Sequence, residues 1–88
     1  MNNNMNNNAG ILELDVHGMT KYQAKVFINS QLKRAKGDIY IIRIVHGYHS
    51  GNELKKMVRE EFKGNPKVKR VQNTLNPGVT ELILRELY

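Results

Sequence analysis

The spacing of apolar side chains along the chain alternates between two-residue and helical periodicity, which predicts strands separated by helices. In residues 11–16, every second side chain is a strong hydrophobe (Leu12, Leu14 and Val16), as in a strand with one buried face. Residues 39–45 are almost continuously apolar and rich in β-branched side chains, so we expect a central strand covered on both faces. Residues 68–72 and 79–87 complete the predicted strands, and the turn sequence at 76–78 joins them in a hairpin.

The first predicted helix begins at Thr20 and continues to about Ala35. Thr20 and Gln23 have the spacing of a capping box, and Gly37 is the expected stop. The residues at helical spacing form an apolar stripe interrupted once by Gln31: Ala24, Phe27, Ile28, Leu32 and Ala35.

A second helix follows the loop at 46–51. Ser50 and Glu53 have the spacing of another capping box, and Gly64 with the following Asn-Pro sequence ends the helix. Its predicted buried side chains are Leu54, Met57, Val58 and Phe62.

The element order βαβαββ predicts an α/β chain folded as an α+β two-layer sandwich, with a four-stranded mixed sheet and two helices. Strands that alternate with helices are joined by right-handed crossovers, whereas the last two strands form an antiparallel hairpin. Two helices are enough to cover one face, which leaves the other face open or partnered.

Composition sets the limits of the domain. Residues 1–10 are rich in Asn and uncharged, so we expect a disordered tail followed by one domain at 11–88. The tail lacks the basic start and apolar stretch of a signal peptide, and no apolar run is long enough to span a membrane. Absence of cysteine excludes disulfides and thiolate chemistry and fits a cytoplasmic protein.

The chain is basic, with fourteen Lys or Arg against eight acidic residues and a formal charge of +6. Such an excess is typical either of a solvated surface or of a polyanionic partner such as DNA or RNA. Lys33, Arg34 and Lys36 leave the same two interpretations open, because cations near a helix C-terminus also complement the helix dipole.

The candidate chemistry lies at two strand ends that share the dipeptide His-Gly. Asp15 and His17 follow the first strand, and His46 follows the second. Sites in open α/β sheets form at the carboxyl ends of strands, and helix N-termini favour phosphate. We therefore predict a phosphodiester site in which imidazoles transfer protons, while Asp15 orients an imidazole or holds a divalent ion such as Mg²⁺ or Mn²⁺.

Loop and helix-start residues complete the predicted site. Glycines let the backbone approach a phosphate, aromatic rings stack on bases, and cations contact phosphates. The candidates for nucleic-acid contact are Gly18, Lys21, Gly47, Tyr48, His49, Gly51, Lys55 and Arg59.

The alternative interpretations of these residues are structural. A strand-end histidine also serves as a hydrogen-bonding turn residue, and Tyr48 and His49 are equally compatible with an ordinary exposed loop. The residue types that could form a zinc site are present, but their spacing matches no metal-binding motif, and no metal ligand is predicted among His17, His46, His49 and Asp15.

Three segments together resemble the Smr (small MutS-related) domain family in its stand-alone bacterial form. They are 14–20 (Leu-Asp-Val-His-Gly-Met-Thr), 44–47 and 76–80, and the resemblance extends from residue 11 to about 87. It implies a fold similar to the C-terminal domain of the third translation initiation factor. It also implies nucleic-acid binding, with endonuclease activity in many members, either DNA nicking or RNA cleavage.

The two His-Gly segments differ in how well they match the family motifs. Asp15 and His17 match the motif that is proposed to be catalytic in active members, which favours an endonuclease. His46 and Gly47 begin the second motif, where the family has H-G-x-G but this chain has His49 and only later Gly51. That departure favours a non-catalytic module that binds nucleic acid or the ribosome. A third hypothesis is an adaptor that binds proteins through the open sheet face.

Overall fold

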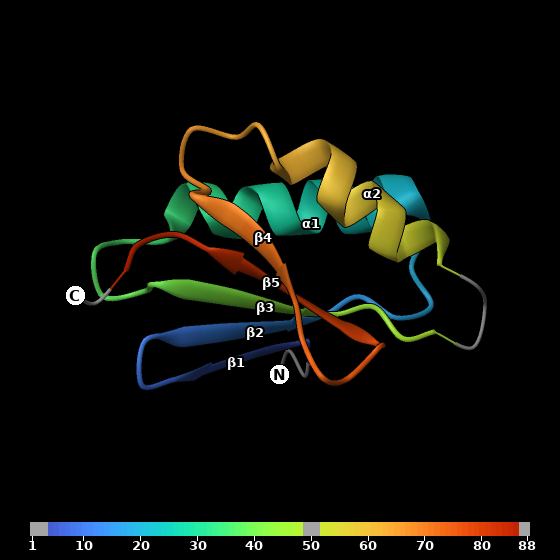
Figure 1. Cartoon of the computed structure of the whole chain (residues 1–88), viewed down its shortest axis with the longest axis horizontal. Coiled ribbons are helices and arrows are strands. Elements are labelled where there is room, and N and C mark those ends of the chain that lie inside the picture. Colours follow the sequence, from blue (N-terminus) through green and yellow to red (C-terminus); the bar gives the residue numbers. More distant parts are fainter. Residues whose placement is uncertain (1–3, 49–51, 87–88) are drawn as a thin grey trace.

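The computed structural model describes residues 4–48 and 52–86, which fold into a five-stranded sheet and two helices (Figure 1). The elements in chain order are β1 (Met5–Asn8), β2 (Ile11–Asp15), α1 (Lys21–Arg34), β3 (Ile41–Val45), α2 (Glu53–Phe62), β4 (Arg70–Asn73) and β5 (Val79–Ile83). From residue 11 onward, the predicted order βαβαββ is confirmed.

The strands lie in the order β1-β2-β3-β5-β4. β2 and β3 are parallel, whereas the other three pairs are antiparallel, so the sheet is mixed and the predicted β4–β5 hairpin is confirmed. The parallel register places Asp15 beside Val45. The loops that leave β2 and β3 therefore start at the same edge of the sheet.

The prediction of four strands is wrong, because β1 lies within the segment that was expected to be disordered. Asn8 pairs with Ile11, and the two intervening residues, Ala9 and Gly10, have φ of 54° and 83°. These positive values are typical of a two-residue type I′ hairpin. All four β1 side chains are exposed, so main-chain hydrogen bonds hold β1 in the sheet. Such bonds do not depend on apolar side chains, which the Asn-rich segment lacks.

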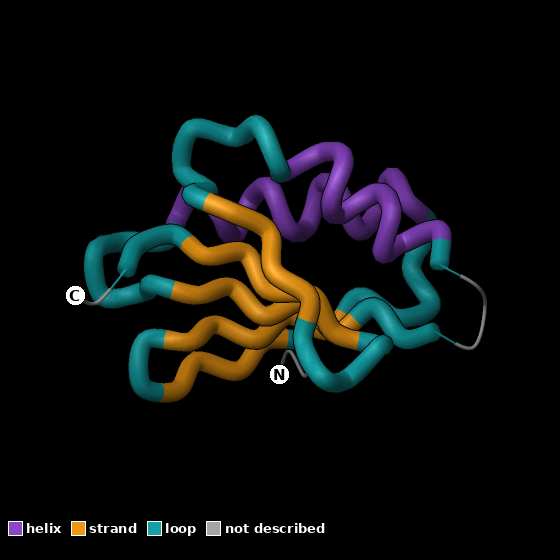
Figure 2. The backbone as a smooth tube through the Cα atoms, in the orientation of Figure 1, coloured by secondary structure: helices purple, strands orange, loops and turns teal. Residues whose placement is uncertain are grey.

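Both helices cover one face of the sheet, as Figure 2 shows. The buried side chains between the two layers include Leu12, Leu14, Val16, Ala24, Ile28, Leu32, Ile42, Ile44, Val58 and Leu82. β3 is central as predicted, but only its alternate residues are buried, and the prediction that it is covered on both faces is wrong.

A row of charged side chains occupies the centre of the open face and explains how β3 remains half exposed. Arg43 donates from Nε to Glu81 Oε2 at 2.9 Å, and its Nη1 lies 3.9 Å from Glu13 Oε1. The three residues are direct neighbours across β2, β3 and β5. Opposite charges on adjacent strands stabilise a solvated sheet face.

Local sequence sets the start of α1, whereas a distant side chain completes its end. The predicted capping box is confirmed: Gln23 N–H donates to Thr20 Oγ1 at 3.1 Å, and Thr20 N–H donates to Gln23 Oε1 at 3.0 Å. At the other end, Lys67 Nζ donates to the carbonyls of Leu32 at 2.6 Å and Ala35 at 3.2 Å. The helix ends at Arg34 with Ala35 as its C-cap, which confirms the predicted end at about Ala35, and Gly37 follows two residues later.

The predicted capping box of α2 is wrong. Glu53 is the first helical residue, and Asn52 precedes it without a side-chain cap. Ser50 lies outside the described residues. Within the described part of the chain, neither helix is both long and apolar enough to cross a membrane.

Replacing Ile28 with Ala tests how much the fold depends on the α1–sheet contact. Ile28 is fully buried, so the substitution should lower the free energy of unfolding by about 2–5 kcal/mol. The matched control is Val26→Ala in the same helix, where the half-exposed side chain predicts a change within about 0.5 kcal/mol. Chemical denaturation measures both, and equal effects would contradict this assignment of the core.

Candidate functional site

Three loops meet at the edge of the sheet where β2 and β3 end. Val16 N–H donates to the carbonyl of Val45 at 2.9 Å, which continues the parallel pairing beyond the strands. The amides of His46 and Gly47 both donate to the carbonyl of Gly78, at 2.9 and 3.0 Å. The turn before β5 therefore holds the loop that follows β3 and fixes it beside the loop that follows β2.

Asp15 and His17 form a hydrogen-bonded pair at the surface. Asp15 Oδ1 lies 2.5 Å from His17 Nδ1 and also accepts from the main-chain N–H of His17 at 3.1 Å. A carboxylate only accepts hydrogen bonds, so Nδ1 carries the proton and Nε2 is the nitrogen open to a substrate. The His17 side chain is 68% exposed. This arrangement, an oriented imidazole with one free nitrogen, suits general acid–base chemistry.

The two glycines of the His-Gly segments shape the loops around this pair. Gly18 and Gly47 have φ of 82° and 74°, a conformation that other residues rarely adopt. A Cβ placed on Gly47 would lie 3.5 Å from the Cβ of His17. The two segments are therefore neighbours in space, as the sequence predicted.

His46 occupies a very different environment from His17. It is only 5% exposed, and its Nε2 lies 2.8 Å from Thr80 Oγ1, while its Nδ1 lies 2.7 Å from the carbonyl of Gly47. Because a carbonyl only accepts, Nδ1 carries the proton, and in the neutral ring Nε2 accepts from the Thr80 hydroxyl. Both ring nitrogens are engaged.

Burial lowers the pKa of His46 from its ordinary value. The hydrogen bond to the Gly47 carbonyl opposes this shift, and the positive charge of Lys55 adds to it. The structure thus keeps His46 neutral and tied to β5. Its predicted catalytic role stays a prediction.

A cavity of about 360 Å³ lies next to these segments, between the start of α1 and the start of α2. Its lining residues are Gly18, Met19, Thr20, Lys21, His46, Glu53 and Leu54. Lys21 Nζ lies 3.6 Å from Glu53 Oε1 across it. The cavity joins the buried histidine to a helix N-terminus and to a lysine that was predicted to contact phosphate.

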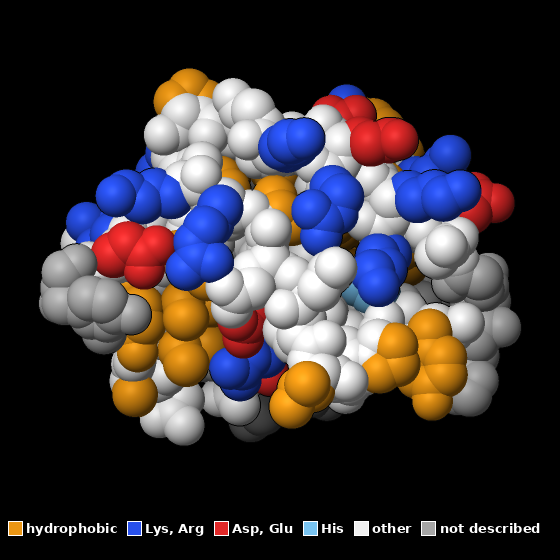
Figure 3. Space-filling view, viewed as in Figure 1, with side chains coloured by type: hydrophobic (Ala, Val, Ile, Leu, Met, Phe, Trp, Pro, Cys, Tyr) orange, Lys and Arg blue, Asp and Glu red, His pale blue; other side chains and the backbone are white. Residues whose placement is uncertain are grey.

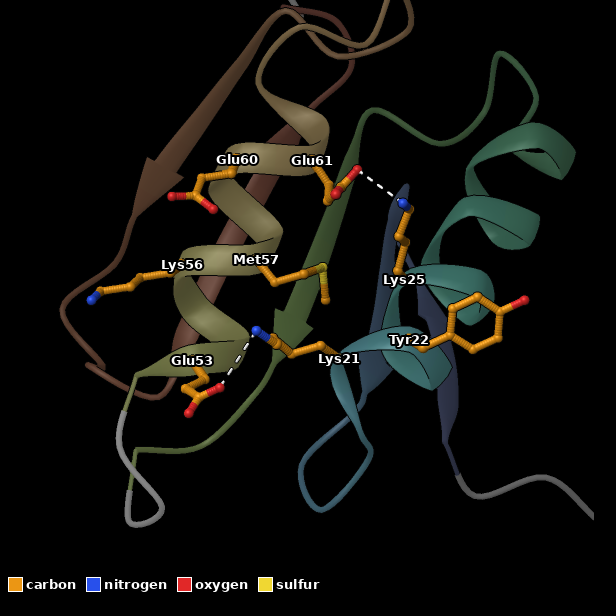
Figure 4. A pocket seen from close by; sticks show the side chains of 8 residues that line it. All are labelled: Lys21, Tyr22, Lys25, Glu53, Lys56, Met57, Glu60 and Glu61. Carbon is orange, nitrogen blue, oxygen red and sulfur yellow. Dashed lines mark ion pairs between the residues drawn. The ribbon is translucent and has the colours of Figure 1, made fainter.

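The charges of α2 divide between its two sides. Towards α1, Lys21 pairs with Glu53 and Lys25 pairs with Glu61 at 3.4 Å, along a groove of about 470 Å³ (Figure 4). Figure 3 shows Lys and Arg side chains across the face formed by α2 and β4. Two of the three acidic side chains that line the groove, Glu53 and Glu61, are thus paired with lysines of α1.

The remaining predicted contacts lie at different distances from the His17 pair. Lys55 is half-buried near His46, whereas Arg59 lies one turn further along α2 and donates from Nη2 to Asn73 Oδ1 at 2.6 Å. Tyr48 is exposed beside Gly78, where an added Cβ would lie 3.2 Å from Tyr48 Cδ1. His49 and Gly51 lie outside the described residues.

The described residues form no cluster of protein ligands that could enclose a metal ion. Within residues 4–48 and 52–86, no three His, Asp or Glu side chains are close enough together to hold one. A divalent ion held by Asp15 with phosphate and water as its other ligands stays a prediction.

Sequence reasoning missed Thr80 as the partner of His46. Its signal was a hydroxyl on the strand face that it shares with the buried Leu82, where a polar group requires a hydrogen-bond partner. The identity of that partner followed only from the antiparallel pairing of β3 and β5.

Comparison with known proteins identifies the family. The model of the Smr domain matches residues 14–80, so the chain belongs to the Smr domain family. The fold is similar to the crystal structure of the Smr domain of Thermus thermophilus MutS2, with a TM-score of 0.74 and 24% sequence identity. The match covers 84% of this chain and 98% of that one. No curated protein sequence matches the chain.

The buried state of His46 predicts a pH-dependent stability. Its folded-state pKa lies below the unfolded value of 6.5, so the unfolded chain binds more protons between the two values. The contribution of neutral His46 to the free energy of unfolding is complete above about pH 6.5 and is lost as the pH falls through the folded-state pKa. Unfolding free energies measured from about pH 7 to 5 should therefore decrease.

One variant isolates this effect. His46→Gln should show a weaker pH dependence of the unfolding free energy than the wild type, because the buried imidazole is removed. An unchanged pH dependence in His46→Gln would contradict the assignment.

Proposed function

We propose that the chain binds nucleic acid at the edge formed by β2 and β3 and cleaves a phosphodiester bond there. The Asp15–His17 pair carries this proposal, because it presents an oriented and exposed imidazole beside two glycine-containing loops. Membership of the Smr domain family supports the same function.

In the proposed reaction, Nε2 of His17 accepts a proton from the nucleophile. With RNA, the nucleophile is the 2′-hydroxyl next to the scissile phosphate; with DNA, it is water. The nucleophile's oxygen forms a bond to phosphorus, the bond to the leaving oxygen breaks, and that oxygen takes up a proton from water, to which His17 later releases its own. Asp15 accepts the hydrogen bond from Nδ1 and stabilises the imidazolium while it exists.

Binding rests on the positive charge and the helix starts around the pair. The N-terminus of α1 follows Gly18 closely, and Lys21 stands at its first turn, where free amides and the helix dipole favour phosphate. Lys55 and Arg59 extend the positive charge along α2. We propose that His46, through Thr80 and Gly47, holds the loop in place; a direct part in proton transfer would require the Thr80 contact to open.

A second candidate function is a non-catalytic module that binds nucleic acid or the ribosome. The burial of His46 favours it, because only one imidazole is then exposed at the site among the described residues. This function predicts salt-sensitive binding without turnover.

Replacing His17 with Ala tests the catalytic assignment. The variant should lose about 10²–10⁴-fold in cleavage rate, since the proton acceptor is removed, while its affinity for nucleic acid stays within a few-fold. Asp15→Asn should reduce cleavage as well, because the amide does not stabilise the imidazolium. The substrates are single-stranded, duplex and branched DNA and RNA, each with and without Mg²⁺ or Mn²⁺.

Two outcomes of this panel are decisive. Cleavage by His17→Ala at the wild-type rate would exclude the proposed acid–base role. Absence of cleavage of every substrate by the wild type, combined with salt-dependent binding, would favour the non-catalytic module.

The salt dependence of binding tests the basic side of α2. Replacing Lys55 and Arg59 with Ala should reduce the slope of log K against log salt by about 1 for each phosphate that the variant no longer neutralises. Lys33→Ala is the matched control, since Lys33 lies in the last turn of α1. Equal slopes for the double variant and the wild type would place the phosphate-binding residues elsewhere.

A further inference from the structure

The side of the molecule formed by β1 and the adjacent side of α1, here called the β1–α1 flank, has no part in the proposed site. It carries three of the five large hydrophobic side chains that are exposed in the described residues: Met5 at 37%, Tyr22 at 75% and Val26 at 49%. Figure 4 shows Tyr22 at the start of α1, pointing away from α2. β1 also precedes the residues matched by the family model, which begin at residue 14.

Among residues 4–48 and 52–86, no strand pairs with the outer edge of β1 on this flank. Asn8 and Ile11 close a two-residue turn and form a hydrogen-bonded pair, so the pattern of an antiparallel ladder directs the N–H and C=O of Met5 and Asn7 outward. β1 carries no charge, whereas the opposite edge strand, β4, begins with Arg70 directly after Lys69. Charged residues normally protect an edge strand from pairing, so β1 is the edge that is open to another strand.

Two cavities line the space between β1 and α1. The larger, about 650 Å³, has no charged residue in its lining and includes Met19, Tyr22, Val26 and Phe27. The second, about 430 Å³, lies at the other end of α1. It is lined by Met5 and Asn7 of β1 and carries Arg34 and Lys36 against one acid, Asp38, so its charge is positive.

The distance between the cavities matches a strand. Val26 and Arg34 are eight residues apart on α1, which corresponds to about 12 Å along the helix. Four residues of an extended chain cover about 13 Å, and side chains four residues apart lie on the same face of a strand. A strand beside β1 therefore places one side chain near each cavity.

We propose that the β1–α1 flank binds an extended peptide segment of a partner protein, which pairs with the outer edge of β1. The segment would carry a large apolar residue for the uncharged cavity and an acidic residue, four positions away, for the positive one. Antiparallel pairing puts the acidic residue first. A second copy of this chain fits less well, since β1 itself has no acidic residue to place near Arg34.

The test uses the whole chain and a fluorescein-labelled nine-residue threonine peptide with glutamate third and phenylalanine seventh. Threonine favours extended structure, so the two functional side chains are presented on one face. Fluorescence anisotropy should show saturable binding. An isomer with phenylalanine sixth, on the opposite face, should bind about tenfold more weakly.

Variants of the chain separate the parts of the proposed interface. Asn7→Pro removes one outward N–H without changing the pairs that Asn6 and Asn8 make with β2, and it should weaken binding about tenfold. Asn7→Ala is its control and should bind within about twofold of the wild type. Tyr22→Ser together with Val26→Ser changes only exposed side chains, so it tests the apolar cavity in a chain whose core is intact, and it should also weaken binding.

Arg34→Glu completes the set and should weaken binding of the glutamate peptide but not of its glutamine analogue. Equal binding of both peptide isomers, or of the Asn7→Pro and Asn7→Ala chains, would overturn the proposal. A concentration-dependent dimer that Asn7→Pro abolishes would overturn it in favour of a second copy. These outcomes are independent of the cleavage assay, because none of the substituted residues belongs to the proposed site.

Discussion

The parallel pairing of β2 with β3 is the constraint on which the site depends. Its register sets Asp15 beside Val45, so both strands end together and both His-Gly segments leave from one edge. β5 then pairs antiparallel with β3, which brings the carbonyl of Gly78 to the amides of His46 and Gly47. A shift of one residue in either register would turn the buried side chains outward, so burial of the core and geometry of the site are fixed by the same pairing.

Two histidines in similar sequence settings acquire opposite properties from this arrangement. His17 stands on the outside of the loop, where Asp15 orients it and solvent reaches it. His46 turns inward, where Thr80 and Gly47 engage both of its nitrogens and burial lowers its pKa. In the proposed reaction, His17 is the imidazole that transfers the proton, whereas His46 supports the loop.

Charge is distributed according to what each surface contacts. In the groove between the helices, Glu53 and Glu61 pair with lysines of α1. On the open sheet face, Arg43 lies between two glutamates, and Lys and Arg side chains lie over α2 and β4. The β1–α1 flank is the contrast, with exposed apolar side chains and a cavity without charges. An excess of positive charge and an uncharged strand edge favour different partners, so the two surfaces are suited to separate roles.

The sequence by itself determined the order of elements after residue 11, the hairpin of β4 and β5, the cap of α1 and the Asp15–His17 pair, because each depends on residues close together in the chain. Tertiary structure decided the rest. β1 formed because a neighbouring strand supplied main-chain partners, and β3 remained half exposed because both helices pack on one face. The Leu32 carbonyl near the end of α1 accepts a hydrogen bond from Lys67, thirty-five residues away. The environment of His46 depends on Thr80, thirty-four residues away, and local sequence does not encode which distant side chain fills a buried contact.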